Sequence, residues 1–217
     1  MNPFDELTTN QAVNVSALKS LSVHRSRLRS ERARIANAYR KESACEALSG
    51  FEKGVEIFGF TKGQFSLVEF TDAVLDVTGP AHISLATWTA GANDVSAILD
   101  WRERGRILSA RWLVDFTFQR RTPELAAKIR EFFGRDAIRV ARNHSKFVLF
   151  TNSSWRVVIL TSMNLNANPR FEYFQVAHDP ARADFLQAML DEIWSVQPSS
   201  LAFESAGTVN RFFKENL

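Results

Sequence analysis

Four polar side chains of the types that act on phosphate groups occur within one stretch of the chain. His144 and Lys146 are two residues apart at the start of an apolar run, and Ser162 and Asn164 are two apart at the end of the next run. Side chains two residues apart on an extended strand share a face. An imidazole can attack phosphorus, while an ammonium and an amide can stabilise charge on phosphoryl oxygens. The pattern predicts a phosphate site, although His-x-Lys by itself is also typical of an ordinary strand edge.

The order of these residues resembles the signature of the phospholipase D superfamily. That signature is His-x-Lys followed by an Asp, then Gly-Ser-x-Asn after a further strand, then a later Glu or Asp. Here His144–Lys146, Ser162 to Asn164 and Glu172 follow the same order between apolar strands. The chain departs from the signature at two positions, since Thr151 replaces the Asp and Thr161 replaces the Gly.

The resemblance implies a role for each residue of the motif. His144 would be the nucleophile that forms a phosphohistidine or, from a second copy, the acid that protonates the leaving group. Lys146 and Asn164 would hold the non-bridging oxygens, with Ser162 hydrogen-bonding nearby. Glu172 would accept a hydrogen bond from the far nitrogen of His144 and fix its tautomer. The resemblance implies no metal and no other cofactor, because cationic side chains stabilise the charge.

The chain has a single His-x-Lys motif, whereas the family's active site uses two that face each other across a pseudo-twofold axis. The other histidines, His24, His82 and His178, lack a lysine two residues later. The resemblance therefore implies a C2 homodimer with one composite site, as in the single-motif bacterial endonucleases of the family. The expected function is a metal-independent phosphodiesterase, a nuclease acting on DNA or RNA, with DNA favoured as the partner.

Two other functions stay open. One is a catalytically inactive phospholipase D-like module that binds nucleic acid or another partner, and the other is a phospholipase or phosphatidyltransferase. A metal-dependent nuclease is disfavoured because the sequence contains no Glu-x-Lys or Asp-x-Lys triplet. A zinc hydrolase is disfavoured because no His-x-x-x-His spacing occurs and Cys45 is the single cysteine.

Further residues could support the site or the core. Arg170 lies close to Glu172 and is a candidate phosphate contact, and Arg120 and Arg121, in an expected loop, could touch a phosphate backbone. His82, within an apolar strand, is expected to be a hydrogen-bonded core histidine. The tryptophans are expected in the core or a dimer interface rather than as base-stacking platforms; they are Trp88, Trp101, Trp112, Trp155 and Trp194.

The excess of positive charge lies at the N-terminal end. The net charge is +3, and residues 1–50 hold eight Lys and Arg against five Asp and Glu, which accounts for all of it. This segment lacks Gly and Pro between Asn10 and Ser49, and its apolar residues recur with helical spacing. We expect a basic helical arm over 1–49 that grips phosphates, pairs with a partner helix, or docks on the domain with a solvated face.

Strand and helix patterns alternate from Gly50 onward. The expected strands are Val55–Phe60, His82–Thr89, one within Arg106–Phe118, Ala137–Phe150, Arg156–Thr161 and Arg170–Ala177. The expected helices are Leu67–Val77, Val95–Arg104 after a cap at Asn93 or Asp94, Pro123–Phe133 and Ala183–Trp194. Strands as apolar as these imply a sheet covered on both faces. The prediction is an α/β protein, a phospholipase D-like layered α/β/α sandwich over 50–196, with an N-terminal helical extension and a C-terminal tail over 197–217.

The sequence also bears on where the protein works. No apolar stretch approaches the roughly 20 residues that cross a bilayer, and the acidic start does not have the pattern of a signal peptide. A single cysteine does not require an oxidising compartment. We expect a soluble, cytoplasmic protein without a membrane partner.

Overall fold

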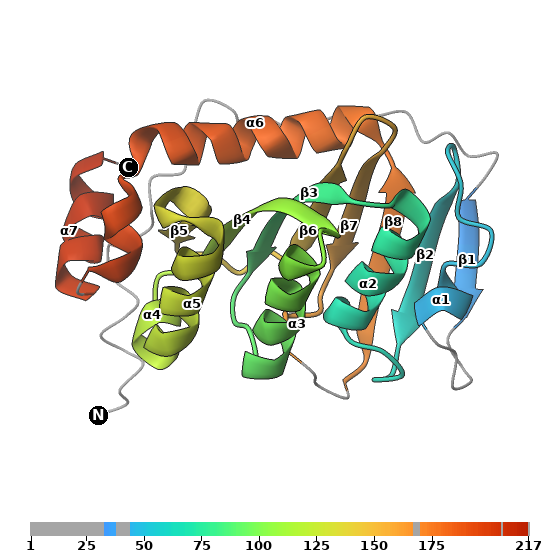
Figure 1. The fold of residues 1–217 in the computed structure, drawn as a ribbon, viewed down its shortest axis with the longest axis horizontal. Helices are drawn as coiled ribbons and strands as arrows, with labels where there is room; N and C mark the ends of the chain where they lie inside the picture. The colour runs from blue at the N-terminus through green and yellow to red at the C-terminus, as the bar shows by residue number, and fades with distance from the viewer. Residues whose placement is uncertain (1–32, 38–43, 167–169, 205, 217) are drawn as a thin grey trace.

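One mixed sheet of eight strands organises the molecule (Figure 1). The computed structural model describes residues 33–37, 44–166, 170–204 and 206–216. The strand order is β1-β2-β8-β7-β6-β3-β4-β5. The strands are β1 (Ala33–Asn37), β2 (Glu56–Thr61), β3 (Ala81–Thr87), β4 (Ile107–Asp115), β5 (Ile138–Ala141), β6 (Phe147–Thr151), β7 (Arg156–Thr161) and β8 (Glu172–His178). The β1–β2, β3–β4 and β4–β5 pairs are parallel, and the four pairs between β2 and β3 are antiparallel.

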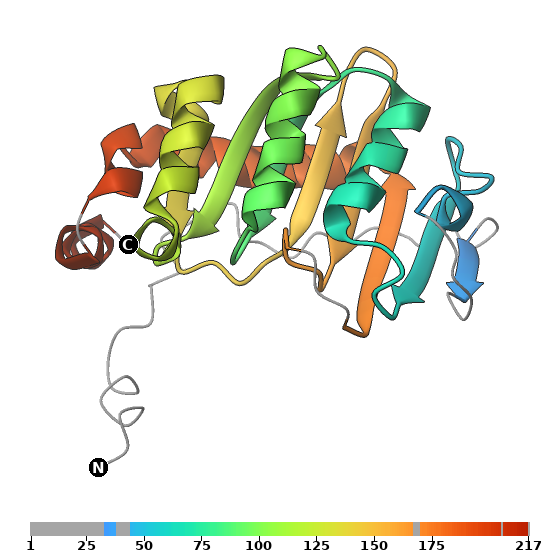
Figure 2. The same ribbon diagram turned by 60° about the horizontal axis from the view of Figure 1, so that its bottom comes forward.

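Helices cover both faces of this sheet. They are α1 (Ala44–Ala47), α2 (Leu67–Thr78), α3 (Ala92–Glu103), α4 (Phe118–Arg121), α5 (Pro123–Phe133), α6 (Pro180–Val196) and α7 (Ala206–Asn216), with short 3-10 helices η4 (Arg135–Ala137) and η5 (Ser199–Phe203). Figure 2 shows α2, α3 and α5 side by side on one face and α6 crossing the other. The predicted layered α/β/α sandwich is confirmed. None of the described helices is long and apolar enough to cross a membrane.

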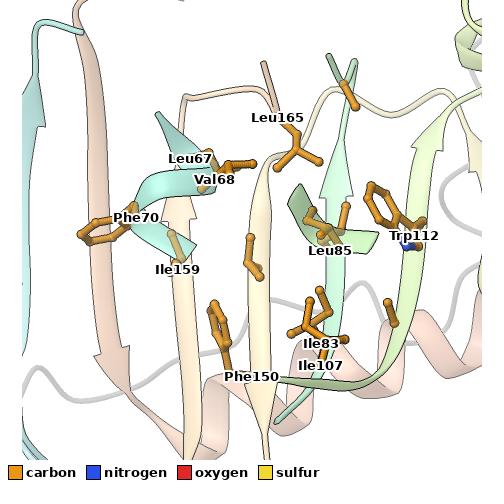
Figure 3. Packing of buried hydrophobic residues seen from close by; sticks show 14 of the residues in the cluster. Leu67, Val68, Phe70, Ile83, Leu85, Ile107, Trp112, Phe150, Ile159 and Leu165 are labelled. Atoms are coloured by element: carbon orange, nitrogen blue, oxygen red, sulfur yellow. The ribbon is translucent and has the colours of Figure 1, made fainter. Parts of the chain in front are cut away.

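The core consists of two apolar layers separated by the sheet. Strand β6 feeds both, because its residues alternate between faces: Val148 and Phe150 join the large cluster under α2, α3 and α5. Phe147 and Leu149 join the smaller cluster under α6. Figure 3 shows part of the large cluster, in which Leu85, Trp112 and Phe150 come from three neighbouring strands.

Local signals explain where two of the helices begin and end. Helix α2 starts with a capping box, in which the Glu69 amide donates to Ser66 Oγ over 3.2 Å and the Ser66 amide donates to Glu69 Oε2 over 2.7 Å. It ends at Gly79, whose φ of 72° suits a residue without a Cβ. Helix α5 begins at Pro123 and ends before Gly134, as the sequence predicts.

Three sequence-based boundaries are wrong. Residues 33–37 form strand β1 instead of part of a helix. By pairing with β2, they satisfy the backbone N–H and C=O groups along the outer edge of β2, which a helix at this position would leave unpaired. The rest of the predicted arm up to residue 43 lies outside the described residues. The expected strand Ala137–Phe150 is two strands, β5 and β6, joined by a loop over 142–146. Helix α3 begins at Ala92 with Gly91 at its N-cap position, and not at Val95 after a cap at Asn93 or Asp94.

The C-terminal tail packs onto the end of the sheet. The side-chain amide of Gln197 pairs with the backbone of Val140, accepting from its N–H over 2.9 Å and donating to its C=O over 2.7 Å. Val209 and Phe213 of α7 are buried. Because β5 is the last strand of the sheet, Gln197 occupies backbone groups that would otherwise form an open edge.

Candidate active site

The predicted site residues gather at one edge of the sheet. Strands β2, β3, β4 and β5 end at this edge, β7 also ends there, and β6 and β8 begin there. Lys146 directly precedes β6, and its C=O accepts from the Thr161 amide at the end of β7 over 3.3 Å. Glu172 begins β8 opposite Thr61, the last residue of β2. The carboxyl ends of parallel strands are a common place for ligand sites in α/β sheets.

Asn143 fixes the loop that carries His144 and Lys146. Its buried side chain donates to the C=O of Thr87 over 3.1 Å and to the C=O of Leu113 over 3.2 Å, which ties the loop to β3 and β4. Its Oδ1 accepts from the Ser145 amide over 3.0 Å. Sequence reasoning missed Asn143, although an Asn that accepts from the amide two residues on is typical of a turn.

His144 and Lys146 lie together, but not for the reason that the sequence suggested. They lie in the loop before β6 and not on a strand, so strand alternation does not align them. Instead, the Lys146 side chain folds back: Nζ lies 3.0 Å from His144 Nδ1 and donates to the His144 C=O over 2.6 Å. The His144 side chain is exposed, whereas Lys146 is only 9% exposed.

Lys146 carries a buried amine next to one carboxylate. Burial lowers the pKa of the Lys146 ammonium, and the nearby Glu172 carboxylate opposes this shift. Burial disfavours the charged form, so a second negative charge close to Nζ would stabilise it. An anion such as phosphate is suited to this position.

Glu172 does not contact His144 as expected. Its Oε2 accepts a hydrogen bond from Ser162 Oγ, which in turn accepts from the Tyr173 amide over 3.0 Å. The expected Glu172–His144 hydrogen bond is therefore wrong for this chain. Ser162 follows β7 and Glu172 begins β8, so the two lie at adjacent ends of paired antiparallel strands. The His144 ring instead faces Lys146 with its Nδ1.

A small pocket beside Glu172 is lined by two more of the predicted residues. Asn164 and Arg170 line it together with Glu172, Thr61 and Ser66. The Oδ1 of Asn164 is buried and has no hydrogen-bond partner. A buried amide oxygen without a partner is costly, and an amide side chain can turn either its oxygen or its nitrogen to a ligand. The pocket therefore offers an amide and a guanidinium beside the carboxylate.

Arg120 and Arg121 also lie at this edge, on the short helix α4 that follows β4. Both are exposed. The Arg121 guanidinium lies 4.4 Å from the centre of the Trp88 ring, and its Nη2 donates to the Trp88 C=O over 2.9 Å. The Trp88 and His144 ring centres are 5.9 Å apart. Trp88 is 38% exposed, so it does not lie in the core of this chain.

The other described histidines lie away from this edge. His82 is exposed at the beginning of β3, with its Nδ1 2.7 Å from Ser109 Oγ, so it is hydrogen-bonded but not a core residue as expected. His178 ends β8 at the same far edge. Among the described residues, no group of three or more His, Cys, Asp or Glu side chains could hold a metal ion.

Taken together, fold and site define an α/β/α protein with a histidine, a buried lysine and several polar groups at the ends of its strands. Neither a family model nor a curated protein sequence matches the chain. Among solved structures, it is similar to polyphosphate kinase from Porphyromonas gingivalis, with a TM-score of 0.46 and 13% identity. The match covers 66% of this chain and 26% of the kinase chain.

These comparisons correct the family assignment. The resemblance to the phospholipase D superfamily, and to its single-motif endonucleases, rested on a partial motif in which Thr151 and Thr161 replace two signature residues. No family model recognises that motif in the chain. The assignment to that superfamily is therefore wrong on the comparisons.

Proposed function

We propose that the protein is a phosphodiesterase that cleaves nucleic acid, DNA in preference to RNA, by transferring the phosphoryl group to His144. The observation that carries the proposal is the pair of His144 and Lys146, an exposed imidazole whose Nδ1 lies 3.0 Å from a buried amine. A nucleophile with a cation beside it is the minimum that attack on an anionic phosphodiester requires.

The protons of the His144 ring connect this geometry to the reaction. In its ammonium form Lys146 can only donate, so its contact makes Nδ1 an acceptor and leaves the ring proton on Nε2. To donate a proton to a leaving oxygen, an imidazole has to be in its cationic form, with a proton on both ring nitrogens, so that the neutral ring remains afterwards. Attack on phosphorus requires the other tautomer, with the proton on Nδ1, which is compatible with the site once the Lys146 ammonium turns from the ring to a phosphate oxygen.

The reaction then has two balanced steps. In the first, Nε2 of one His144 bonds to phosphorus while the phosphorus–oxygen bond to the leaving group breaks, and a second imidazole, which starts as the imidazolium cation, gives that oxygen a proton and becomes neutral. In the second, a water molecule gives its proton to the second imidazole and bonds to phosphorus while the phosphorus–nitrogen bond breaks. In this proposal Lys146, Asn164 and Arg170 hold the non-bridging oxygens, and Ser162 hydrogen-bonds nearby. The support is that Lys146 lies next to His144, while Asn164 and Arg170 line the pocket beside Glu172.

The second imidazole is proposed to come from a second copy of the chain. Among the described residues His144 is the one histidine at this edge, because His82 and His178 lie at the far edge. A twofold axis close to the loop over 142–146 would bring the two His144 rings to one phosphorus atom. The exposed Arg120 and Arg121 and the net charge of +3 favour a polyanionic substrate.

The test is a cleavage assay on labelled DNA and RNA in the presence of EDTA. We expect cleavage to persist in EDTA, His144→Ala to lower the rate by at least about 100-fold, and the matched variant His82→Ala to cleave normally. A requirement for added metal, or cleavage that survives His144→Ala, would contradict the proposal. Gel-shift binding without cleavage would favour a nucleic-acid-binding module in place of an enzyme.

A further inference from the structure

We propose that Trp88, held by Arg121, forms a nucleobase-stacking subsite next to His144, which makes single-stranded nucleic acid the preferred substrate class. This inference rests on the proposed function and deepens it, because it concerns what the same edge of the sheet binds besides the phosphate.

The first support is the position of the indole. Trp88 follows directly after β3 at the edge where His144 lies, and the two ring centres are 5.9 Å apart at an interplanar angle of 48°. Large aromatic side chains are usually well covered in folded proteins, yet 38% of Trp88 remains exposed. By contrast, Trp112 of the neighbouring strand β4 is fully buried. The exposed indole therefore places an apolar surface directly beside the ring of the proposed nucleophile, His144.

The second support is the way Arg121 holds that indole. Its guanidinium lies over the ring at 4.4 Å while its Nη2 donates to the backbone C=O of the same residue over 2.9 Å. The cation–π contact and the hydrogen bond together restrict both side chains. Single-stranded nucleic acid is typically bound by aromatic rings that stack on bases beside cations that follow the backbone. Trp88 and Arg121 supply one of each.

Trp88 and Arg121 together favour one class of phosphodiester substrate over others. A phospholipid has no planar ring to stack on an indole, and a base within a duplex has its faces covered by neighbouring bases. An unpaired base exposes its face. A base of a single strand can therefore stack on the Trp88 indole while the phosphate next to that base reaches His144 and Lys146. Because every base has such a face, we expect little preference among bases.

The test measures binding of a fluorescently labelled single-stranded oligonucleotide by anisotropy, with phosphorothioate linkages to slow cleavage. We expect Trp88→Leu to weaken binding about 5- to 150-fold, the range that loss of one stacked base gives. Trp88→Phe keeps an aromatic face and should retain most of the affinity. An otherwise identical abasic oligonucleotide should bind the wild type and Trp88→Leu equally.

The chain offers a matched control at the opposite edge of the sheet. Trp155 also has a cation over its ring, Lys53 at 5.3 Å, and a histidine ring beside it, His178 at 5.4 Å. We expect Trp155→Leu to bind the oligonucleotide like the wild type. In addition, the oligonucleotide should quench the tryptophan fluorescence of the wild type more than that of Trp88→Phe, a readout that does not depend on the Leu variant folding.

The outcomes separate this inference from the proposed function. Unchanged binding by Trp88→Leu, or equal losses for single strands, duplexes, abasic strands and phosphatidylcholine vesicles, would overturn the subsite even if the wild type cleaves DNA. Binding that depends on Trp88 without any cleavage would support the subsite and overturn the proposed function.

Discussion

The buried Lys146 is proposed to bind the phosphate, and its burial lowers the stability of the folded protein at a pH where the amine is charged. Its amine is buried beside an exposed imidazole, and burial lowers its pKa while Glu172 opposes the shift. A folded state that disfavours the ammonium binds fewer protons than the unfolded state does. The free energy of unfolding therefore rises with pH between the lowered pKa of Lys146 and its ordinary value of 10.5.

The variant Lys146→Met tests this cost. It should lack the part of the pH-dependent rise that Lys146 contributes, so the stability of the wild type relative to the variant should increase from pH 7 towards pH 10.5. Urea unfolding of both proteins across this range measures the difference. The variant should also lose phosphodiester cleavage, because the phosphoryl oxygens lose their cation. Parallel stability curves for the two proteins would contradict the account of Lys146.

At the residue scale, the sequence identified the members of the site better than their contacts. The spacing of His144, Lys146, Ser162 and Asn164 places them at one edge because each lies at the end of a strand or beside one. The partner of Glu172 was not predictable, because Ser162 and His144 compete for it and only the packed arrangement decides. Asn143 was missed because its role depends on the C=O groups of two distant strands.

At the scale of elements, the loop over 142–146 positions the reactive side chains and depends on one tether. Asn143 holds this loop through buried hydrogen bonds to the ends of β3 and β4. A polar tether of similar construction exists at the far edge, where Asn152 donates to the C=O groups of Thr78 and Pro80, both over 3.0 Å. Comparing variants of Asn143 and Asn152 separates the effect of losing such a tether on stability from its effect on cleavage.

The variants Asn143→Ala and Asn152→Ala should therefore behave differently. Each should lower the free energy of unfolding, by about 1–3 kcal/mol where the orphaned partners are buried. Only Asn143→Ala should reduce cleavage by more than its loss of folded protein explains, since it releases His144. Urea unfolding and cleavage rates measured on both variants make the comparison. Equal cleavage by the two variants would show that the tether does not position the site.

The elements themselves differed in how far the sequence predicted them. Helices α2 and α5 have their own start and stop residues, such as Ser66 with Glu69 and the glycines that end them, so their bounds were predictable. Strand β1 was not, because residues 33–37 become a strand only by pairing with the edge of β2. A helical spacing of apolar residues does not describe that long-range contact.

At the scale of the whole molecule, the site is proposed to be complete only in a homodimer. If both His144 rings act on one phosphorus atom, a dimer with one His144→Ala subunit is inactive. When wild-type and variant subunits are unfolded, mixed in equal amounts and refolded together, about one quarter of the dimers carry two intact copies. The activity should fall to that fraction of an all-wild-type sample. A fall to about one half, or a monomeric mass by light scattering, would contradict the composite site.

The covalent step at His144 can be examined most directly by mass spectrometry of the protein quenched in alkali during turnover of an oligonucleotide. The account predicts a peptide containing His144 that carries a phosphoryl-linked nucleotide, absent from His144→Ala and removed by a chase without substrate. Rapid cleavage with no adduct, or an adduct on another residue, would contradict it.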